Sequence, residues 1–199
     1  MTAHPPDVVP HAPVVDRARR WARTGCRGAT VWFTGIPASG KSTLAYTVEA
    51  MLVAGGRLAY VLDGDNLRCG LNADLGFSPQ DRAENVRRLG HVAAVLADAG
   101  AVALVAAVSP DRAARDAVRR IHGEAGLHFV EVHVATPLAV CEQRDPKGLY
   151  ARARQGAVVG LTGYDAPYDE PARPELVLGV GEVSLERQAA AVVEHLERR

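Results

Sequence analysis

Residues 35–43 carry the strongest chemical signal in the sequence. They read GIPASGKST and match the GxxxxGK[ST] pattern of a phosphate-binding loop. In such a loop the glycines let backbone N–H groups converge on phosphate oxygens, and the following helix N-terminus adds positive potential. Lys41 is placed to reach the β- and γ-phosphates, and the Ser42 hydroxyl is placed for Mg²⁺. The predicted nucleotide site comprises Gly35, Ile36, Pro37, Ala38, Ser39, Gly40, Lys41, Ser42 and Thr43.

A second polar cluster, Asp63-Gly64-Asp65-Asn66, follows the next predicted strand. Because the carboxyl ends of parallel strands share one edge of a sheet, Asp63 should face the phosphate loop. A carboxylate there can hold Mg²⁺ and orient or deprotonate an acceptor hydroxyl. Turn chemistry alone would also explain the cluster. With the phosphate loop opposite, a functional role is favoured.

Alternating strands and helices must position these residues. Strands are predicted at 30–34, 58–62, 102–108, 129–134 and 176–178. Helices are predicted at 41–54, 78–100, 109–121, 136–144, 149–155 and 185–196, with Ser78-Pro79 and Ser109-Pro110 as helix starts. The alternation predicts an α/β fold, a parallel sheet of about five strands with helices on both faces. The family resemblance set out below implies that this fold is P-loop kinase-like.

Two segments differ in composition from the rest of the chain, residues 1–25 and residues 145–174. Residues 1–25 contain four early prolines and then four arginines, which predicts a mobile N-terminal tail leading into a short helical turn. Residues 26–199 are predicted to form a single domain, which the same resemblance implies is a P-loop kinase domain. Within it, the segment 145–174 is rich in Gly, Pro and charge and predicts a mobile basic lid that excludes water. Only two of the 23 basic residues are lysines, Lys41 in the loop and Lys147 in the lid.

Composition excludes several classes of protein. The 23 basic residues balance 23 acidic ones over 199 residues, which argues against a broad nucleic-acid-binding face. No apolar run approaches the roughly 20 residues of a membrane span. The N-terminus lacks a signal pattern, and the three cysteines contain no CxxC pair. We expect a cytoplasmic protein with small-molecule partners, no nucleic-acid partner and no membrane partner.

Several longer blocks, in sequence order, resemble the adenylylsulfate kinase family. They are DGDNLRCGL at 63–71, LGFSPQDRAENVRRLG at 75–90, SPDRAAR at 109–115 and CEQRDPKGLYARAR at 141–154. The resemblance implies transfer of the γ-phosphate of MgATP to the 3′-hydroxyl of adenosine 5′-phosphosulfate (APS). The products would be 3′-phosphoadenylyl sulfate (PAPS) and ADP, in sulfate assimilation. Family members are commonly dimers, so the resemblance also implies a homodimer.

The resemblance also implies roles for individual residues. Lys41, Asp63 and Ser109 would be catalytic, Ser42 and Asp63 would hold the metal, and the acceptor site would comprise Asp65, Arg68, Phe77, Arg82, Asn85, Val108, Lys147 and Leu161. Guanidinium forks suit a phosphosulfate, and an aromatic face suits adenine.

Five residues have a structural interpretation beside a functional one. The family's Ser-Pro serine, here Ser109, has been regarded as a phosphoserine intermediate, but direct in-line transfer needs none, and we favour a role in shaping the loop. Arg112 and Arg115 meet anionic ligand groups or line a helix face. Arg87 and Arg88 are interpreted as a solvated helix face.

A few residues depart from the family pattern. Leu161 stands where a Phe usually stacks on the adenine opposite Phe77, which removes about 1 kcal/mol of aromatic contact. Leu161→Phe is therefore expected to tighten APS binding. Ala107 and Asp111 replace bulkier family residues, and Pro37 and Ala38 stiffen the phosphate loop.

Three functions remain open at this point. The favoured one is an APS kinase with a weakened adenine sandwich. The second is a family member that phosphorylates another hydroxyl acceptor in a specialised pathway. The third is a non-catalytic nucleotide-binding regulatory subunit, against which the intact Lys41, Ser42 and Asp63 argue.

Overall fold

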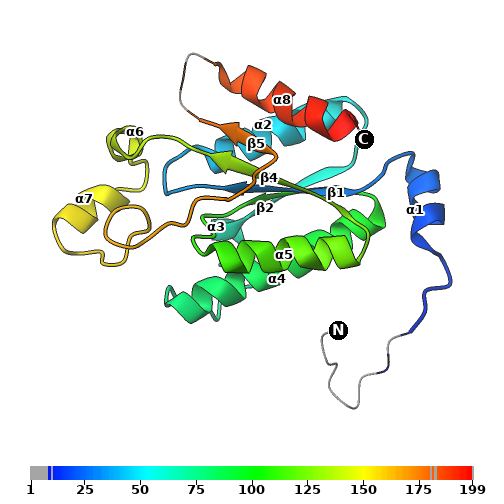
Figure 1. Ribbon diagram of the computed structural model, residues 1–199, viewed down its shortest axis with the longest axis horizontal. Coiled ribbons are helices and arrows are strands. Elements are labelled where there is room, and N and C mark those ends of the chain that lie inside the picture. Colours follow the sequence, from blue (N-terminus) through cyan, green and yellow to red (C-terminus); the bar gives the residue numbers. More distant parts are fainter. Residues whose placement is uncertain (1–8, 10, 180, 182, 199) are drawn as a thin grey trace.

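The protein is built on a five-stranded parallel sheet with the strand order β2-β3-β1-β4-β5 (Figure 1). A computed structural model describes residues 9, 11–179, 181 and 183–198. The strands are β1 (Ala29–Thr34), β2 (Ala59–Asp63), β3 (Val102–Ala106), β4 (His128–Val134) and β5 (Leu176–Leu178). Every neighbouring pair is parallel, which confirms the α/β class and the five predicted strands.

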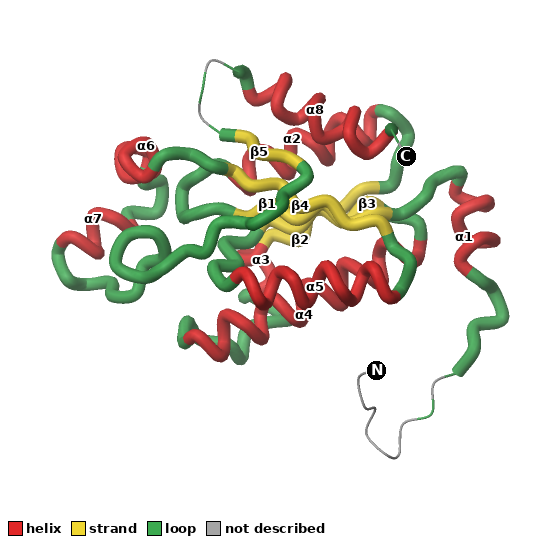
Figure 2. The backbone as a smooth tube through the Cα atoms, viewed as in Figure 1, coloured by secondary structure: helices red, strands yellow, loops and turns green. Residues whose placement is uncertain are grey.

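Helices cover both faces of this sheet (Figure 2). They are α1 (Arg17–Thr24), α2 (Lys41–Ala54), α3 (Gly64–Leu67), α4 (Pro79–Ala99), α5 (Arg112–Glu124), α6 (Leu138–Arg144), α7 (Leu149–Arg154) and α8 (Leu185–Glu197). Helices α2 and α8 lie on one face, and α4 and α5 lie on the other (Figure 1). Within the described residues, none of the helices combines the length and apolarity that a membrane crossing requires.

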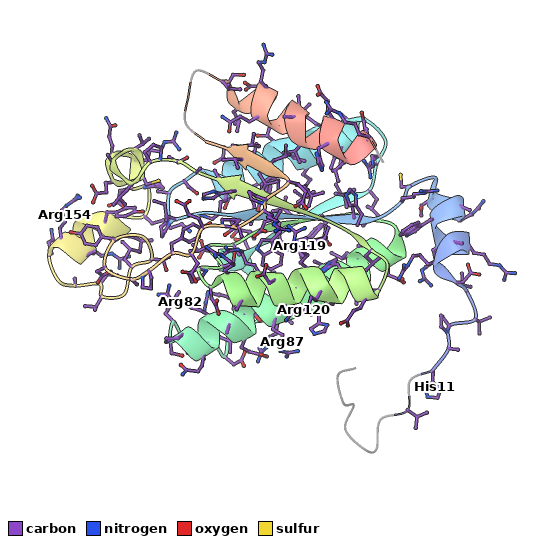
Figure 3. All side chains as sticks on the ribbon, in the orientation of Figure 1. His11, Arg82, Arg87, Arg119, Arg120 and Arg154 are labelled. Carbon is purple, nitrogen blue, oxygen red and sulfur yellow. The ribbon has the colours of Figure 1, made fainter. Side chains whose placement is uncertain are left out.

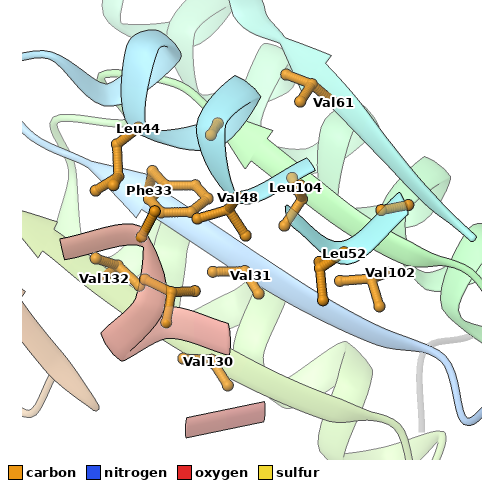
Figure 4. Packing of buried hydrophobic residues seen from close by; sticks show 14 of the residues in the cluster. Val31, Phe33, Leu44, Val48, Leu52, Val61, Val102, Leu104, Val130 and Val132 are labelled. Carbon is orange, nitrogen blue, oxygen red and sulfur yellow. The ribbon is translucent and has the colours of Figure 1, made fainter. Parts of the chain in front are cut away.

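The core has one layer on each side of the sheet. Phe33 packs with Leu44 and Leu104 beneath α2 and α8, as Figure 4 shows. Its neighbour Trp32 points the other way and packs with Leu89 and Val105 beneath α4 and α5. Because successive side chains of a strand alternate between faces, a continuous apolar strand such as β1 suits a sheet covered on both sides.

The long helix α4 starts and ends where the sequence predicts. Ser78 Oγ accepts a hydrogen bond from the backbone N–H of Asp81 at 3.1 Å, with Pro79 at the first helical position. Gly100, at φ +102°, ends the helix in the left-handed conformation. This helix therefore carries its own start and stop signals.

The predicted start of α5 at Ser109-Pro110 is wrong. The N-cap is Asp111, whose carboxylate accepts a hydrogen bond from the backbone N–H of Ala113 at 2.8 Å. Ser109 has φ +42°, whereas an N-cap residue takes an extended conformation. Strand β3 correspondingly ends at Ala106 instead of Val108. The four residues between β3 and Asp111 form a separate turn at the carboxyl edge of the sheet.

The N-terminal segment ends in the helix α1, which contacts the end of α4. Arg17 and Arg20 both form ion pairs with Asp98, and Trp21 Nε1 donates to the Ala97 carbonyl at 3.3 Å. Residues 1–8 and 10 of the predicted tail lie outside the described residues. Helix α1 lies at the amino ends of the strands, remote from the turns that follow β1 and β2 (Figure 1).

Candidate active site

The phosphate loop joins β1 to α2 at the carboxyl edge of the sheet. A Cβ at Gly35 would lie 2.6 Å from the Val134 carbonyl oxygen, so the loop can approach β4 only with glycine there. Lys41 follows the loop as the first residue of α2, and its Nζ donates to the Ile36 carbonyl at 2.8 Å. Burial lowers the pKa of Lys41 from 10.5 to about 8. The loop therefore encloses a cation whose charge is sensitive to mildly alkaline pH.

Ala38 is strained within the same loop. Its φ of +61° lies in the left-handed region, which costs an L-residue with a side chain about 1–2 kcal/mol. Glycine adopts this left-handed conformation without strain, and the sequence has alanine here instead. The loop nevertheless keeps the left-handed conformation at Ala38, so the strain energy is present in the folded protein.

Asp63 ends β2 and faces the phosphate loop, as predicted from the strand order. Its Oδ2 accepts a hydrogen bond from Ser42 Oγ at 2.6 Å, and its Oδ1 accepts one from the backbone N–H of Asp65 at 2.9 Å. Asp63 is 7% exposed. The structure thus brings the two predicted metal-holding residues into direct contact at the edge of the loop.

A cavity of about 1110 Å³ opens beside this pair. It is lined by nearly all of the predicted site residues, namely Pro37, Ala38, Ser39, Gly40, Lys41, Ser42, Thr43, Asp63, Asp65, Arg68, Phe77, Arg82, Asn85, Val108, Ser109, Lys147 and Leu161. The predicted residues Gly35 and Ile36 are not among its lining, and Ile36 lines a second cavity of about 650 Å³. The volume of the main cavity lies just above the roughly 300–1000 Å³ that is typical of ligand pockets.

The part of the cavity that the sequence predicts to bind the acceptor contains a stacked cation and aromatic ring. The Arg68 guanidinium lies 4.3 Å from the centroid of the Phe77 ring and donates to the carbonyls of Leu75 and Gly76. Phe77 is 69% exposed, so one face of its ring is available to a ligand. Asn85 Oδ1 accepts a hydrogen bond from Asn72 Nδ2 at 2.9 Å.

Two contacts join the lid segment to this side of the cavity. Arg82, at the start of α4, donates to the Gly160 carbonyl at 2.8 Å and to Thr162 Oγ1; Figure 3 shows it at the α7 end of the molecule. Lys147 forms an ion pair with Asp65. Both contacts bring lid residues to the mouth of the cavity.

Leu161 lines the cavity but is only 7% exposed. The rest of its side chain packs with Cys141 and Tyr150. The larger Phe that the family usually has would therefore have to turn its ring toward the cavity.

Ser109 presents a buried hydroxyl. Its Oγ accepts a hydrogen bond from Trp32 Nε1 at 3.0 Å and donates to Thr34 Oγ1 at 3.1 Å, and the residue is 3% exposed. Neither interpretation of Arg115 describes its position, because Arg115 is 1% exposed and donates to the Ser109 carbonyl at 2.6 Å. Arg87 and Arg88, in contrast, form ion pairs on the surface of α4.

Comparison with known proteins identifies the family. The family model described as adenylylsulphate kinase matches residues 27–179. This chain belongs to the adenylylsulphate kinase family. The "Adenylyl-sulfate kinase" of Shewanella amazonensis is 51% identical over 189 residues, covering 95% of this chain and 94% of that relative. The "Bifunctional enzyme CysN/CysC" of Mycobacterium tuberculosis H37Rv is 56% identical over 171 residues, covering 86% of this chain but 28% of that relative.

A solved structure of the same family has the same fold. The Mycobacterium tuberculosis APS kinase CysC, in complex with AMPPNP and APS, superposes with a TM-score of 0.84 at 55% sequence identity. The match covers 86% of this chain and 99% of that chain. The P-loop kinase-like fold predicted from the sequence is thereby confirmed.

Sequence analysis missed residues that brace the kinase's phosphate loop from behind. Thr136 Oγ1 donates to the Ser39 carbonyl at 2.7 Å, and Tyr150 OH donates to the Pro37 carbonyl at 2.9 Å. Thr136 precedes a proline and was visible only as a helix start, while Tyr150 lies in the predicted lid. The buried Asn72, whose Oδ1 has no hydrogen-bond partner among the described residues, carried no sequence signal either.

Proposed function

We propose that this chain transfers the γ-phosphate of ATP to the 3′-hydroxyl of APS, giving PAPS and ADP. The observation that carries the proposal is a single cavity with a phosphate loop at one end and the Arg68–Phe77 stack at the other. Asp63, at the carboxyl end of β2, lines the same cavity and contacts Ser42 of the phosphate loop. The ATP analogue and APS bound in the solved relative support both ends of this assignment.

The nucleotide side supplies positive charge to the phosphoryl group in transfer. Lys41 binds the β- and γ-phosphates as an ammonium, and backbone N–H groups of the loop bind the remaining phosphate oxygens. The 3′-hydroxyl then approaches in line with the bond that breaks. Asp63 orients that hydroxyl and accepts its proton.

The hydroxyl and carboxylate oxygens of Ser42 and Asp63, 2.6 Å apart, fit Mg²⁺. The described residues contain no cluster of three or more His, Cys, Asp or Glu side chains suited to a metal ion. In kinase sites Mg²⁺ takes one or two protein ligands together with substrate phosphates and water. When bound, Mg²⁺ neutralises developing charge on the phosphate oxygens.

The acceptor side holds APS by stacking and by charge. Phe77 offers its exposed face to the adenine, and Arg68, Arg82 and Lys147 offer cations to the phosphosulfate. The Asp65 carboxylate accepts hydrogen bonds from the ribose or base, and the Asn85 amide N–H donates one. Val108 and Leu161 complete the apolar wall. The Ser109 hydroxyl acts by shaping this wall, because both of its hydrogen-bonding roles are already taken inside the protein.

Three features of the whole chain complete the proposal. Residues 145–174 act as a mobile lid on a single kinase domain of residues 26–199. The enzyme is a homodimer that acts in the cytoplasm. Size-exclusion chromatography with light scattering tests the dimer, and a mass of one chain, 21.1 kDa, would contradict it.

An ADP-release assay with ATP and APS tests the function, with other hydroxyl acceptors as controls. Turnover with APS is expected. Turnover with a different nucleoside or sugar acceptor but not with APS would favour a specialised family member. Tight nucleotide binding without turnover on any acceptor would favour the regulatory subunit.

A further inference from the structure

Arg115 is a buried cation that the proposed mechanism does not use. It is 1% exposed on α5, and its Nε donates to Glu131 of β4 at 2.8 Å. Burying an ion pair costs several kcal/mol of desolvation for each ion, and apolar residues of similar volume are often as stable. Stability alone is therefore a weak reason for a guanidinium at this position.

The other two arms of the guanidinium bind backbone carbonyls from distant segments. Nη1 donates to the Ser109 carbonyl and Nη2 donates to the Asp169 carbonyl, both at 2.6 Å. Only arginine offers donors in such a planar fork. Arg115 thus joins the turn after β3 to Asp169, near the anchored carboxyl-terminal end of the lid segment, although the two are far apart in the sequence.

The turn that Arg115 holds is part of the acceptor wall. Residues 106–110 line the main cavity. Within this turn, Ser109 adopts φ +42°, an unfavourable conformation for a residue with a side chain. Such a conformation persists only where its surroundings enforce it. The Arg115 bond to the Ser109 carbonyl is a direct constraint of that kind.

The segment at Asp169 is also tied to the turn. We call residues 165–170 the strap. Its Asp169 N–H donates to the Pro110 carbonyl at 2.9 Å, and Tyr168 OH lies 3.0 Å from Thr34 Oγ1. Just upstream, Gly160 and Thr162 accept hydrogen bonds from Arg82. The strap and the residues just upstream of it therefore connect the Ser109 turn to Arg82.

We propose that Arg115 is a positioning residue for the acceptor site, which holds the Ser109 turn and the strap in one fixed arrangement. It touches neither substrate and acts through the wall formed by residues 107–110. The proposal rests on the proposed function, since it predicts an effect on APS and not on ATP. Loss of its fork lets Ser109 relax toward an extended conformation and withdraws the wall from APS.

Arg119 provides a matched control one helical turn away. It binds the same carboxylate, Glu131, at 3.2 Å and also Glu175 at 2.6 Å, but no bond joins it to the Ser109 turn or the strap. Figure 3 shows it between α5 and the sheet. Arg115→Lys and Arg119→Lys therefore disturb one ion network, while only the first removes the bonds that position the turn.

Steady-state kinetics of the two variants test the proposal. Arg115→Lys is expected to raise the KM for APS about tenfold, with the KM for ATP changed less than about twofold. Arg119→Lys is expected to change both constants less than about twofold, whatever its melting temperature. Equal effects of the two variants on the KM for APS would overturn the proposal.

Trp32 gives a readout that does not depend on turnover. Its indole N–H donates to Ser109 Oγ, and the only other tryptophan, Trp21, is replaced by Phe in the test protein. In that background Arg115→Lys should shift the Trp32 emission, and Arg119→Lys should leave it unchanged. An identical spectrum in both would overturn the proposal even if the wild type does not act on APS, which separates it from failure of the proposed function.

Tyr168→Phe tests the same arrangement if Arg115→Lys does not fold. It removes only the hydroxyl that faces Thr34 and keeps the ring beside Arg115. The expected result is a change in the same direction, with the KM for APS raised about threefold and the Trp32 emission shifted. If the KM for APS and the Trp32 emission both stay unchanged in Tyr168→Phe, the proposed role of the strap is contradicted.

Discussion

The two ends of the cavity are built in different ways. The nucleotide side is one continuous loop followed by a buried lysine, 8% exposed, and it is braced from behind by Thr136 and Tyr150. The acceptor side is assembled from segments near residues 63–85, 107–110 and 147–162, and its Lys147 side chain is 59% exposed. A preformed phosphate loop thus faces a proposed acceptor site whose shape depends on long-range contacts.

This difference separates two kinds of kinetic effect. Changes to the buried loop should lower the rate of phosphate transfer, because the loop acts on the transition state. Changes to the acceptor side should mainly alter the KM for APS, because these residues bind groups that do not react.

Lys41→Ala should lower kcat by at least about 1000-fold, because the ammonium that meets the transferring phosphate is lost. The matched change on the other side, Lys147→Ala, should raise the KM for APS about tenfold and leave kcat within about threefold. Initial rates at varied ATP and APS measure both. A similar loss of kcat in the two variants would contradict the contrast.

The kcat/KM for ATP should fall about tenfold for each pH unit above about 8. The Lys41 pKa of about 8 means that the free protein loses this charge as the pH rises through that value. The value of kcat should stay level to higher pH, since bound phosphates favour the charged lysine. A pH series in wild type and Lys41→Arg measures this. If kcat/KM for ATP in Lys41→Arg falls above pH 8 in the same way, the fall belongs to the titration of another group.

Ser109→Ala should keep its activity within about tenfold of wild type while losing about 1–2 kcal/mol of stability, because Trp32 Nε1 loses its acceptor. Activity is measured by ADP release, and stability by urea denaturation. A loss as large as that of Lys41→Ala would instead support a phosphoserine intermediate.

Leu161→Phe should lower the KM for APS about fivefold, which corresponds to about 1 kcal/mol of stacking on the base. Since Leu161 already packs with Cys141 and Tyr150, the melting temperature should fall at the same time. Leu161→Ala is the control, with a raised KM for APS. An unchanged KM for APS in Leu161→Phe would contradict stacking of residue 161 on the adenine opposite Phe77.

Ala38→Gly should raise the melting temperature by about 1–2 °C. Glycine relieves the left-handed strain at φ +61°, and the greater entropy of the unfolded glycine chain offsets part of that gain. Calorimetry measures the change, and Ala54→Gly, at the end of α2, is the control that should lower the melting temperature. A lower melting temperature for both variants would contradict strain at Ala38.

The fold was predictable because its signals are local. The buried strands are short apolar runs, and helices such as α4 carry their own capping residues. The prediction for the start of α5 was wrong because Ser109-Pro110 has the composition of a helix start, whereas tertiary contacts from Trp32 and Arg115 hold Ser109 in another conformation. Long-range contacts therefore override the local conformational preference of these two residues.

The site was predictable to the extent that its residues belong to motifs. Lys41, Ser42 and Asp63 follow from the phosphate loop and the strand order. The acceptor residues came from resemblance to a family, because no spacing rule connects Arg68 with Lys147. The burial of Asn72 and Arg115 could not be anticipated, since polar residues in helices and turns are usually exposed.

The most direct test of the account is to follow labelled phosphate from γ-³²P-ATP in a reaction with APS. We expect label in a single nucleotide product that carries the phosphate on its 3′-oxygen, formed in equal amount with ADP. Substitution of 3′-deoxy APS should abolish the labelled nucleotide. Label released only as inorganic phosphate, or transferred to 3′-deoxy APS as readily as to APS, would contradict the central claim.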